Sequence, residues 1–275
     1  MGRMTDRRRV VRVDDGRVVT RPDTLAVEEP LEVRVDGRSM AVTMRTPGDD
    51  VDLAIGFLLT EGLIRGGDDV SIARFCAGST DDGVNTFNVL DVTLADGVPA
   101  PAPSAERTFY TTSSCGVCGK ASIDAIRTRT QWPVADDPLR LDPEVLISLP
   151  DRLRESQRMF ERTGGLHAAG LFTPAGDLLC LREDVGRHNA VDKVIGWAAR
   201  EGRLPLAGTV LQVSGRASFE LVQKAVMAGI PMLAAVSAPS SLAVELAAES
   251  GMTLVGFLRG TSYNVYTGQQ RLGLS

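Results

Sequence analysis

Two cysteines, Cys115 and Cys118, form a C-x-x-C pair within the stretch TTSSCGVCGKASID, residues 111–124. A pair at this spacing can coordinate zinc, exchange disulfides, or present one reactive thiolate that carries sulfur. It can also be two incidental thiols in a turn. The small neighbours Ser114 and Gly116 favour an exposed loop, in which Cys115 could meet both a sulfur donor and a sulfur acceptor.

The surrounding sequence gives limited support for metal or redox chemistry. A structural zinc site needs four ligands, and this chain has a single C-x-x-C pair. Completing the site would require the other cysteines or the two histidines: Cys76, Cys180, His167 and His188. We expect Cys180 to point inward from a strand, and we predict no permanent metal. A disulfide exchanger would need a thioredoxin-like context, which is missing. Both alternatives stay open.

Two segments with arginines precede expected helices. REDVGRHNAVDK, residues 182–193, places Arg187 before a helix, and VSGRASFE, residues 213–220, places Arg216 between a strand and a helix. Backbone N–H groups at a helix start bind anions, and a guanidinium adds a planar donor. The plain alternatives are a charged first turn and an ordinary helix cap.

Two further segments lie at the ends of expected strands. GGLHAAG, residues 164–170, places His167 after two glycines that allow close backbone approach. FLRGTSYNVY, residues 257–266, runs from an apolar strand into Arg259. An arginine beside a glycine at a strand end suits a phosphate or a purine edge. The alternative for His167 is a hydrogen-bonded core histidine. The alternative for residues 257–266 is a strand end followed by an exposed hairpin.

The elements that position these residues divide at VPAPAPSAE, residues 98–106. Before it, residues 8–46 alternate apolar and polar positions between the turn signals DDG and VDGRS, which predicts an antiparallel sheet. Residues 46–64 predict a helix with acids near its start, and residues 84–95 predict more strand. The buried stripe of the helix is expected to be Leu53, Phe57, Leu58 and Leu63.

The second part alternates helices and strands, which predicts an α/β fold with at least part of its sheet parallel. Ligands of such sheets bind in the loops beyond the carboxyl ends of the strands. Helices are expected near 119–129, at 150–163 and within 188–200, with a hairpin around 174–177. We assign three parts to the chain: an N-terminal arm (1–14), an α+β subdomain (15–108), and an α/β domain with the C-x-x-C loop (109–275).

Composition excludes several classes of protein. The 275-residue chain has a net charge of −5, which gives no general attraction to nucleic acid or anionic membranes. No window approaches 18 consecutive apolar residues, so no transmembrane helix is expected. The first residues lack the apolar region of a signal peptide. Four cysteines are too few for a disulfide framework, so we expect a cytoplasmic protein with reduced thiols.

Taken together, these segments closely resemble the FdhD family, the formate dehydrogenase accessory sulfurtransferases. The matching pieces cover most of residues 28–266 in the family's order. They are EEPLEVRVDG, MRTPGDDVDLAIGFLLTEGLI, SSCGVCGKASID, GGLHAAGLF, EDVGRHNAVDKVIG, SGRASFELVQKAVMAGIP, SAPSSLAVELA and GFLRGTSYNVY.

The resemblance implies a sulfur carrier that takes sulfur from a cysteine desulfurase as a persulfide. The acceptor would be the molybdenum (or tungsten) bis-molybdopterin guanine dinucleotide cofactor, before its insertion into formate dehydrogenase. Cys115 would bear the persulfide, with Cys118 as its companion. The segment matching the family's cofactor-binding residues is Phe257, Leu258, Arg259, Gly260, Thr261 and Ser262; with it we group His167, Arg187 and Arg216 as candidate contacts to the GDP-like moieties. A non-catalytic, cofactor-binding chaperone is the rival function.

The resemblance also implies a cytidine-deaminase-like three-layer α/β core, beside the smaller N-terminal α+β subdomain, and a homodimer. Zinc deaminases carry H-x-E followed by P-C-x-x-C. In this chain the C-x-x-C comes first, no proline precedes it, and the segment His167-Ala168-Ala169 lacks the glutamate. A hydrolytic deaminase is therefore poorly supported, because function depends on the site more than on the fold.

Overall fold

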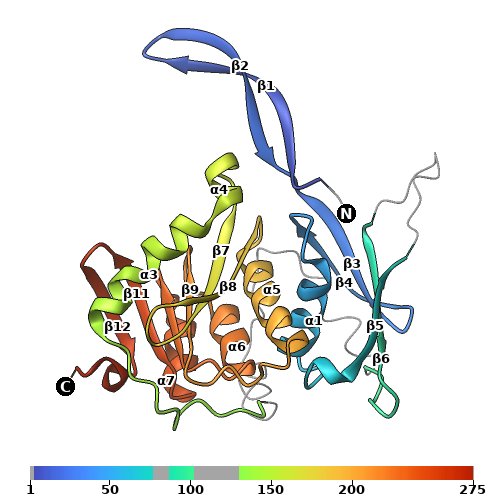
Figure 1. The fold of residues 1–275 in the computed structure, drawn as a ribbon, viewed down its shortest axis with the longest axis vertical. Helices are drawn as coiled ribbons and strands as arrows, with labels where there is room; N and C mark the ends of the chain where they lie inside the picture. Colours follow the sequence, from blue (N-terminus) through green and yellow to red (C-terminus); the bar gives the residue numbers. More distant parts are fainter. Residues whose placement is uncertain (1–2, 77–86, 102–129, 275) are drawn as a thin grey trace.

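A computed structural model describes residues 3–76, 87–101 and 130–274, and within them the chain forms three β-sheets with helices packed between and around them (Figure 1). The fold is a mixed α/β fold, as the alternating pattern predicts. The C-x-x-C pair and the helix expected near 119–129 lie outside the described residues, and so does most of the proline-rich boundary.

The largest sheet has six strands in the order β12-β11-β10-β9-β7-β8. Strands β9, β10 and β11 are parallel, which confirms the prediction of a partly parallel sheet. Strand β7 is antiparallel to both β8 and β9, and β12 is antiparallel to β11. The strands are β7 (His167–Phe172), β8 (Leu178–Asp184), β9 (Val210–Val213), β10 (Met232–Ala235), β11 (Thr253–Arg259) and β12 (Ser262–Thr267).

Helices cover both faces of this sheet. Successive side chains of a strand point to opposite faces, and β9 shows the consequence. Leu211 and Val213 join the core that includes the helices of one face, whereas Val210 packs with Leu146 and Leu149 of the helix on the other. The helices are α5 (Arg187–Arg200), α6 (Phe219–Met227) and α7 (Ser241–Glu249) on the first face and α3 (Pro143–Ser156) on the second, followed by the short α4 (Arg158–Thr163).

The helix expected at 150–163 differs in the structure. Helix α3 starts at Pro143, because the Asp142 carboxylate accepts a hydrogen bond from the backbone N–H of Glu144 (2.8 Å) and proline fits the first helical position. It ends at Ser156, and α4 follows Gln157 as a separate helix. The sequence signal for this earlier start is the Asp142-Pro143 pair, an N-cap residue followed by proline.

A second sheet has four strands in the order β4-β3-β6-β5. They are β3 (Glu29–Val35), β4 (Arg38–Arg45), β5 (Val70–Phe75) and β6 (Val89–Leu94). Helix α1 (Asp50–Thr60) lies between this sheet and α5 (Figure 1). The apolar residues of α1, this sheet and the large sheet belong to one continuous core, so the two predicted α/β parts share their interior. Two short 3-10 helices span Gly67–Asp69 and Gln269–Leu272.

Helix α1 is buried more completely than a single stripe would allow. Leu53 and Leu58 are buried as predicted, but Ile55 is buried too, and Phe57 is only partly covered. The reason is that α1 packs against a sheet on one side and a helix on the other. Gly56 of α1 faces α5 so closely that an added Cβ would overlap the Asp192 backbone carbonyl.

The first two strands form a hairpin of their own. Strands β1 (Thr5–Asp14) and β2 (Arg17–Ala26) make a two-stranded sheet that projects from the body (Figure 1). The prediction of one antiparallel sheet over residues 8–46 is therefore wrong in part, because only β3 and β4 pair within it as part of the main body. The predicted arm, 1–14, contains one strand of this hairpin. The DG turn that connects β1 and β2 has positive φ at Asp15 and Gly16 (46° and 79°), as a tight hairpin requires.

Candidate functional site

One edge of the six-stranded sheet gathers the candidate residues of the second half. Strands β9, β10 and β11 are parallel, so the loops after them emerge at the same edge. Strand β8 also ends there and β7 begins there, because β7 runs antiparallel to both β8 and β9. His167, Arg187, Arg216 and the segment 257–262 therefore meet at one edge, although about a hundred residues separate the first from the last.

Hydrogen bonds join the loops that follow β9, β10 and β11 at this edge. We call the surface formed by these joined loops the ledge. The Ser237 N–H donates to the Gly215 carbonyl (3.3 Å), and the Phe257 N–H donates to the Ser237 carbonyl (3.1 Å). The Arg259 Nε donates to the Val236 carbonyl (2.8 Å). The loops after the three parallel strands are thus held in fixed relation to one another.

His167 lies half-buried at the start of β7, paired in register with Asp184 of β8. A Cβ added at Gly215 would lie 3.3 Å from the His167 Nδ1, so this glycine lets the loop pass close to the ring. Burial lowers the pKa of His167, and the nearby positive charges of Arg187 and His188 lower it further, against the opposing effect of Asp184. The ring is therefore neutral at pH 7 and can accept a hydrogen bond.

His188, the only other histidine of the chain, lies at the same edge in the first turn of α5. Its Nε2 is 2.5 Å from a carboxylate oxygen of Glu220 and 3.2 Å from the Ser218 hydroxyl. The hydrogen bond from His188 lowers the pKa of Glu220, despite its partial burial. Glu220 is a site residue that the sequence reasoning missed. Its one signal was an acidic side chain in the first turn of a helix.

Two arginines at this edge are available to an anion. The Arg187 Nε is buried and has no hydrogen-bond partner among the described residues. Arg216 is exposed in the loop between β9 and α6. The helices that follow, α5 and α6, start at Gly186 and Ser218 with no side-chain cap. Within the described part of the chain no side chain caps their first N–H groups, which can therefore bind an anion, as expected at helix starts.

The segment 257–262 turns sharply from β11 into β12. The two strands form a hairpin, which is one of the two alternatives that the sequence offered for residues 257–266. Phe257 has a positive φ of 53°, rare for a bulky residue, and 42% of its surface is exposed. Gly260, at the turn, also has a φ of 53°. Arg259, Thr261 and Ser262 are exposed.

Leu258 is the exception within this segment. Its side chain is fully buried in the core beneath α3, so only its backbone is available to a ligand. The strand pleat explains the difference, because neighbours of an exposed strand residue point the other way. Leu258 belongs to the segment that the resemblance assigns to cofactor binding, and a contact there would have to use its backbone.

A buried ion pair holds the start of α5 in place. The Lys193 ammonium lies 2.7 Å from the Asp184 carboxylate and donates to the Thr46 carbonyl (2.9 Å). Asp184 also accepts from the Gly186 N–H (2.8 Å) and from the Asn189 amide (2.9 Å). Because Thr46 lies in the N-terminal half, this cluster fastens that half to the first turn of α5.

Of the two described cysteines, Cys180 is a poor sulfur carrier. Cys180 points inward from β8, as predicted, and burial raises the pKa of its thiol to about 12. Cys76 is half-buried at the end of β5. Within residues 3–76, 87–101 and 130–274, no three His, Cys, Asp or Glu side chains gather as a metal site requires. Because Cys115 and Cys118 lie outside these ranges, the zinc alternative is not tested.

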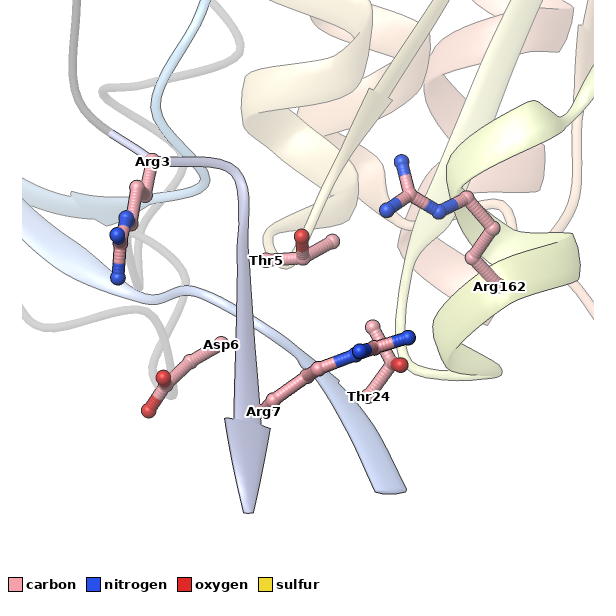
Figure 2. A pocket seen from close by; sticks show the side chains of 6 residues that line it. All are labelled: Arg3, Thr5, Asp6, Arg7, Thr24 and Arg162. Carbon is pink, nitrogen blue, oxygen red and sulfur yellow. The ribbon is translucent and has the colours of Figure 1, made fainter. Parts of the chain in front are cut away.

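Two hollows of the described part lie away from this edge. One, of about 500 Å³, opens between the hairpin and α4 (Figure 2). The other, of about 290 Å³, lies beside α7 and the end of β12. The candidate site is better described as an open ledge bearing arginines, two histidines and two helix starts.

No helix in the part of the chain that the structure covers is long and apolar enough to cross a membrane.

Comparison with known proteins gives consistent matches along the chain. The model of the FdhD/NarQ family matches residues 26–273. A protein of Streptomyces avermitilis named sulfur carrier protein FdhD is 65% identical over the whole chain and 98% of its own length. A relative of the same name from Mycobacterium tuberculosis is 57% identical, covering 99% of this chain and all of its own.

A solved structure matches as well. It is the crystal structure of a protein from Desulfotalea psychrophila, described as a candidate formate dehydrogenase accessory protein. Its TM-score is 0.76 at 26% identity, and the match covers 98% of this chain and all of the other.

Proposed function

Because the chain belongs to the FdhD/NarQ family, we propose that it is a sulfurtransferase that carries sulfur as a persulfide. The donor is a cysteine desulfurase, and the acceptor substrate is the molybdenum bis-molybdopterin guanine dinucleotide cofactor, which formate dehydrogenase needs for activity. The protein acts in the cytoplasm, where thiols stay reduced. Relatives named as sulfur carriers, 57–65% identical to this chain, support this assignment.

The proposal that the acceptor is a guanine dinucleotide cofactor rests on the ledge at the edge of the large sheet. A guanine dinucleotide presents a diphosphate and a purine. Arg187, Arg216 and Arg259 and the uncapped starts of α5 and α6 supply donors for the diphosphate. Phe257 supplies an exposed aromatic face for the base. This combination of groups suits an anionic nucleotide far better than a neutral metabolite.

The sulfur chemistry falls to Cys115 and Cys118. The Cys115 thiolate attacks the terminal sulfur of the donor persulfide, a new S–S bond forms, and the donor cysteine leaves as its thiolate. Attack by the Cys118 thiolate on the inner sulfur of this persulfide then releases hydrosulfide to the acceptor. That step leaves a Cys115–Cys118 disulfide, because the pair supplies the two electrons, and a cellular thiol reductant resets it.

The test is mass spectrometry of the full-length protein after incubation with a cysteine desulfurase and cysteine. We expect one added sulfur atom on the peptide containing Cys115 and none after reduction. Cys180 is the internal control, since its buried thiol is in the wrong protonation state to accept sulfur. An unmodified Cys115 peptide would reject the carrier function and favour the rival, a chaperone that only binds the cofactor.

A genetic test separates the same two functions. Cys115→Ala should abolish maturation of formate dehydrogenase while leaving the thermal unfolding of the protein unchanged. Full maturation by this variant would reject the role of Cys115.

Two properties implied by the family resemblance stay predictions: the cytidine-deaminase-like kinship of the core and the homodimer. Sedimentation of the pure protein tests the homodimer.

A further inference from the structure

The hairpin of β1 and β2 projects from the body without a described partner along most of its length (Figure 1). Every residue from 11 to 20 is exposed. The family model starts at residue 26 and therefore leaves out nearly all of the hairpin. The match to the Streptomyces avermitilis relative includes the hairpin, because it covers the whole chain. An isolated two-stranded hairpin is marginally stable in water, so a surface that stabilises it on contact is expected.

The strand register sorts the hairpin into two faces. Thr5 pairs with Ala26, and each later pair follows in step to Asp14 and Arg17, so alternate pairs share a face. We call one of them the valine–arginine face: Thr5, Arg7, Arg9, Val11 and Val13 of β1 with Val18, Thr20, Pro22, Thr24 and Ala26 of β2. At its tip Val11, Val13 and Val18 are 65%, 65% and 68% exposed.

The two faces differ in how their charges are paired. On the opposite face Arg8 pairs with Asp6 (2.7 Å) and Arg12 pairs with Asp14 (3.3 Å). The valine–arginine face has two arginines, Arg7 and Arg9, and no acidic residue. Neither has a hydrogen-bond or ion-pair partner among the described residues. The opposite face thus mixes four arginines with three aspartates, whereas the positive charge of the valine–arginine face has no acidic counterpart on that face.

At the base of the valine–arginine face, Arg7 lines a hollow together with Arg162 of α4. Figure 2 shows Arg7 and Arg162 of α4 beside Thr5 and Thr24 in one hollow, which Arg3 and Asp6 also line from the other side of β1. Among the described residues, the one hydrogen bond of the Arg162 guanidinium is a weak one to the Met159 sulfur (4.0 Å). Two guanidiniums and two hydroxyls match the donors that a carboxylate prefers.

The charge of the hairpin is opposite to that of the chain. Residues 1–26 contain seven arginines and four aspartates, a net charge of +3, in a chain whose net charge is −5. Nucleic acid would be attracted to the arginines but repelled by the body, and it offers little to three exposed valines. A partner that is apolar at one end and acidic at the other complements both ends of the face.

We propose that the valine–arginine face is a docking site for an extended segment of another protein. Apolar side chains of that segment cover Val11, Val13 and Val18, and its carboxylates enter the hollow between Arg7 and Arg162. The seven residues from Arg7 to Val13 span about 20 Å in a strand, so the docked segment has about seven residues in the same conformation. Docking here requires no part of the sulfur chemistry proposed above.

The test uses the full-length protein and a labelled synthetic probe, the peptide Val-Thr-Val-Thr-Glu-Glu-Glu, followed by fluorescence anisotropy. We expect Arg7→Glu and Arg162→Glu each to weaken binding by about tenfold or more, because each reverses a charge that faces the carboxylates. The matched control is Arg21→Glu, on the opposite face of the same hairpin; it should change the affinity by less than about twofold.

Four outcomes would overturn this docking site. They are no binding of the probe, equal loss from Arg7→Glu and Arg21→Glu, equal binding of a probe with glutamine in place of glutamate, and tighter binding of a single-stranded oligonucleotide of equal charge. A self-associated state that disappears with Val18→Asp and that the probe does not displace would assign the face to a second copy instead. Unchanged thermal unfolding of each variant ensures that the comparison concerns folded protein.

Discussion

The Nε2 atom of His188 lies 2.5 Å from a carboxylate oxygen of Glu220, and this contact joins the first turns of α5 and α6 at the edge of the large sheet. Both side chains are partly exposed, and the Ser218 hydroxyl lies 3.2 Å from the same nitrogen. The pair therefore holds together two of the helix starts that the proposed nucleotide site uses.

Glu220→Gln should destabilise the protein by about 1 kcal/mol at pH 7, a small value because the pair is partly exposed. Since the pKa of Glu220 in the folded protein is lowered, its contribution is present above the ordinary value of 4.5 and is lost as the pH falls through the lowered pKa. Urea unfolding of both proteins at pH 7 and below pH 4 measures this. An equal difference at both pH values would contradict it.

Phe257→Gly should give a more stable protein than Phe257→Ala, by about 1 kcal/mol. Alanine is normally the more favourable of the two, but a φ of 53° penalises every residue with a Cβ. Thermal or urea unfolding of the two variants measures the difference. If the alanine variant were the more stable, the backbone at this position would not be strained.

Arg259→Ala should weaken binding of GDP by about tenfold, the cost of one charge-assisted hydrogen bond. The side chain is exposed at the ledge, where its Nε is already held by the Val236 carbonyl. Titration calorimetry with GDP measures the effect, and Arg74→Ala, an exposed arginine on β5 of the other sheet, is the matched control. Equal affinities of these two variants would remove Arg259 from the site.

Cys180 should resist alkylation in the folded protein at pH 8. The thiolate is the reactive form, and a pKa of about 12 leaves very little of it. Iodoacetamide labelling followed by peptide mass spectrometry should find Cys180 unmodified until urea is added. Labelling at the rate of a free cysteine in native buffer would show that the β8 core opens readily.

Gly56→Ala should cost about 3 kcal/mol or more, because its methyl group would overlap the backbone of α5 and force the two helices apart. Gly66→Ala is the control, since no atom lies within 4 Å of its added Cβ and its backbone is extended. It should change the free energy of unfolding by less than about 0.5 kcal/mol. Similar losses in both variants would show that the helix contact is loose.

Local patterns predicted the elements that lie next to each other in sequence. The hairpin of β7 and β8, the span of α5 and the alternation from β9 to β11 are confirmed, because their apolar periodicity and turn residues act over a few positions. Strand β5 was missed, and β1 and β2 were placed in the wrong sheet. Which strands pair is set by packing between distant segments, and an alternating pattern alone does not identify the partner.

The sequence by itself determined the chemistry that the chain offers: a C-x-x-C pair, two histidines, and arginines next to glycines in an order that resembles one family. Only the tertiary structure decided which of these groups meet. The parallel order of β9, β10 and β11 brings Arg216 and Arg259 to one edge, and the antiparallel pairing of β7 with β8 and β9 brings Arg187 there. The strand pleat turns Leu258 away from this edge. Likewise, Arg7 has no ion-pair partner within the described ranges, and the fold places it at the same hollow as Arg162. Residue types are local properties of a sequence, whereas their meeting depends on strand order and register, which the whole core sets.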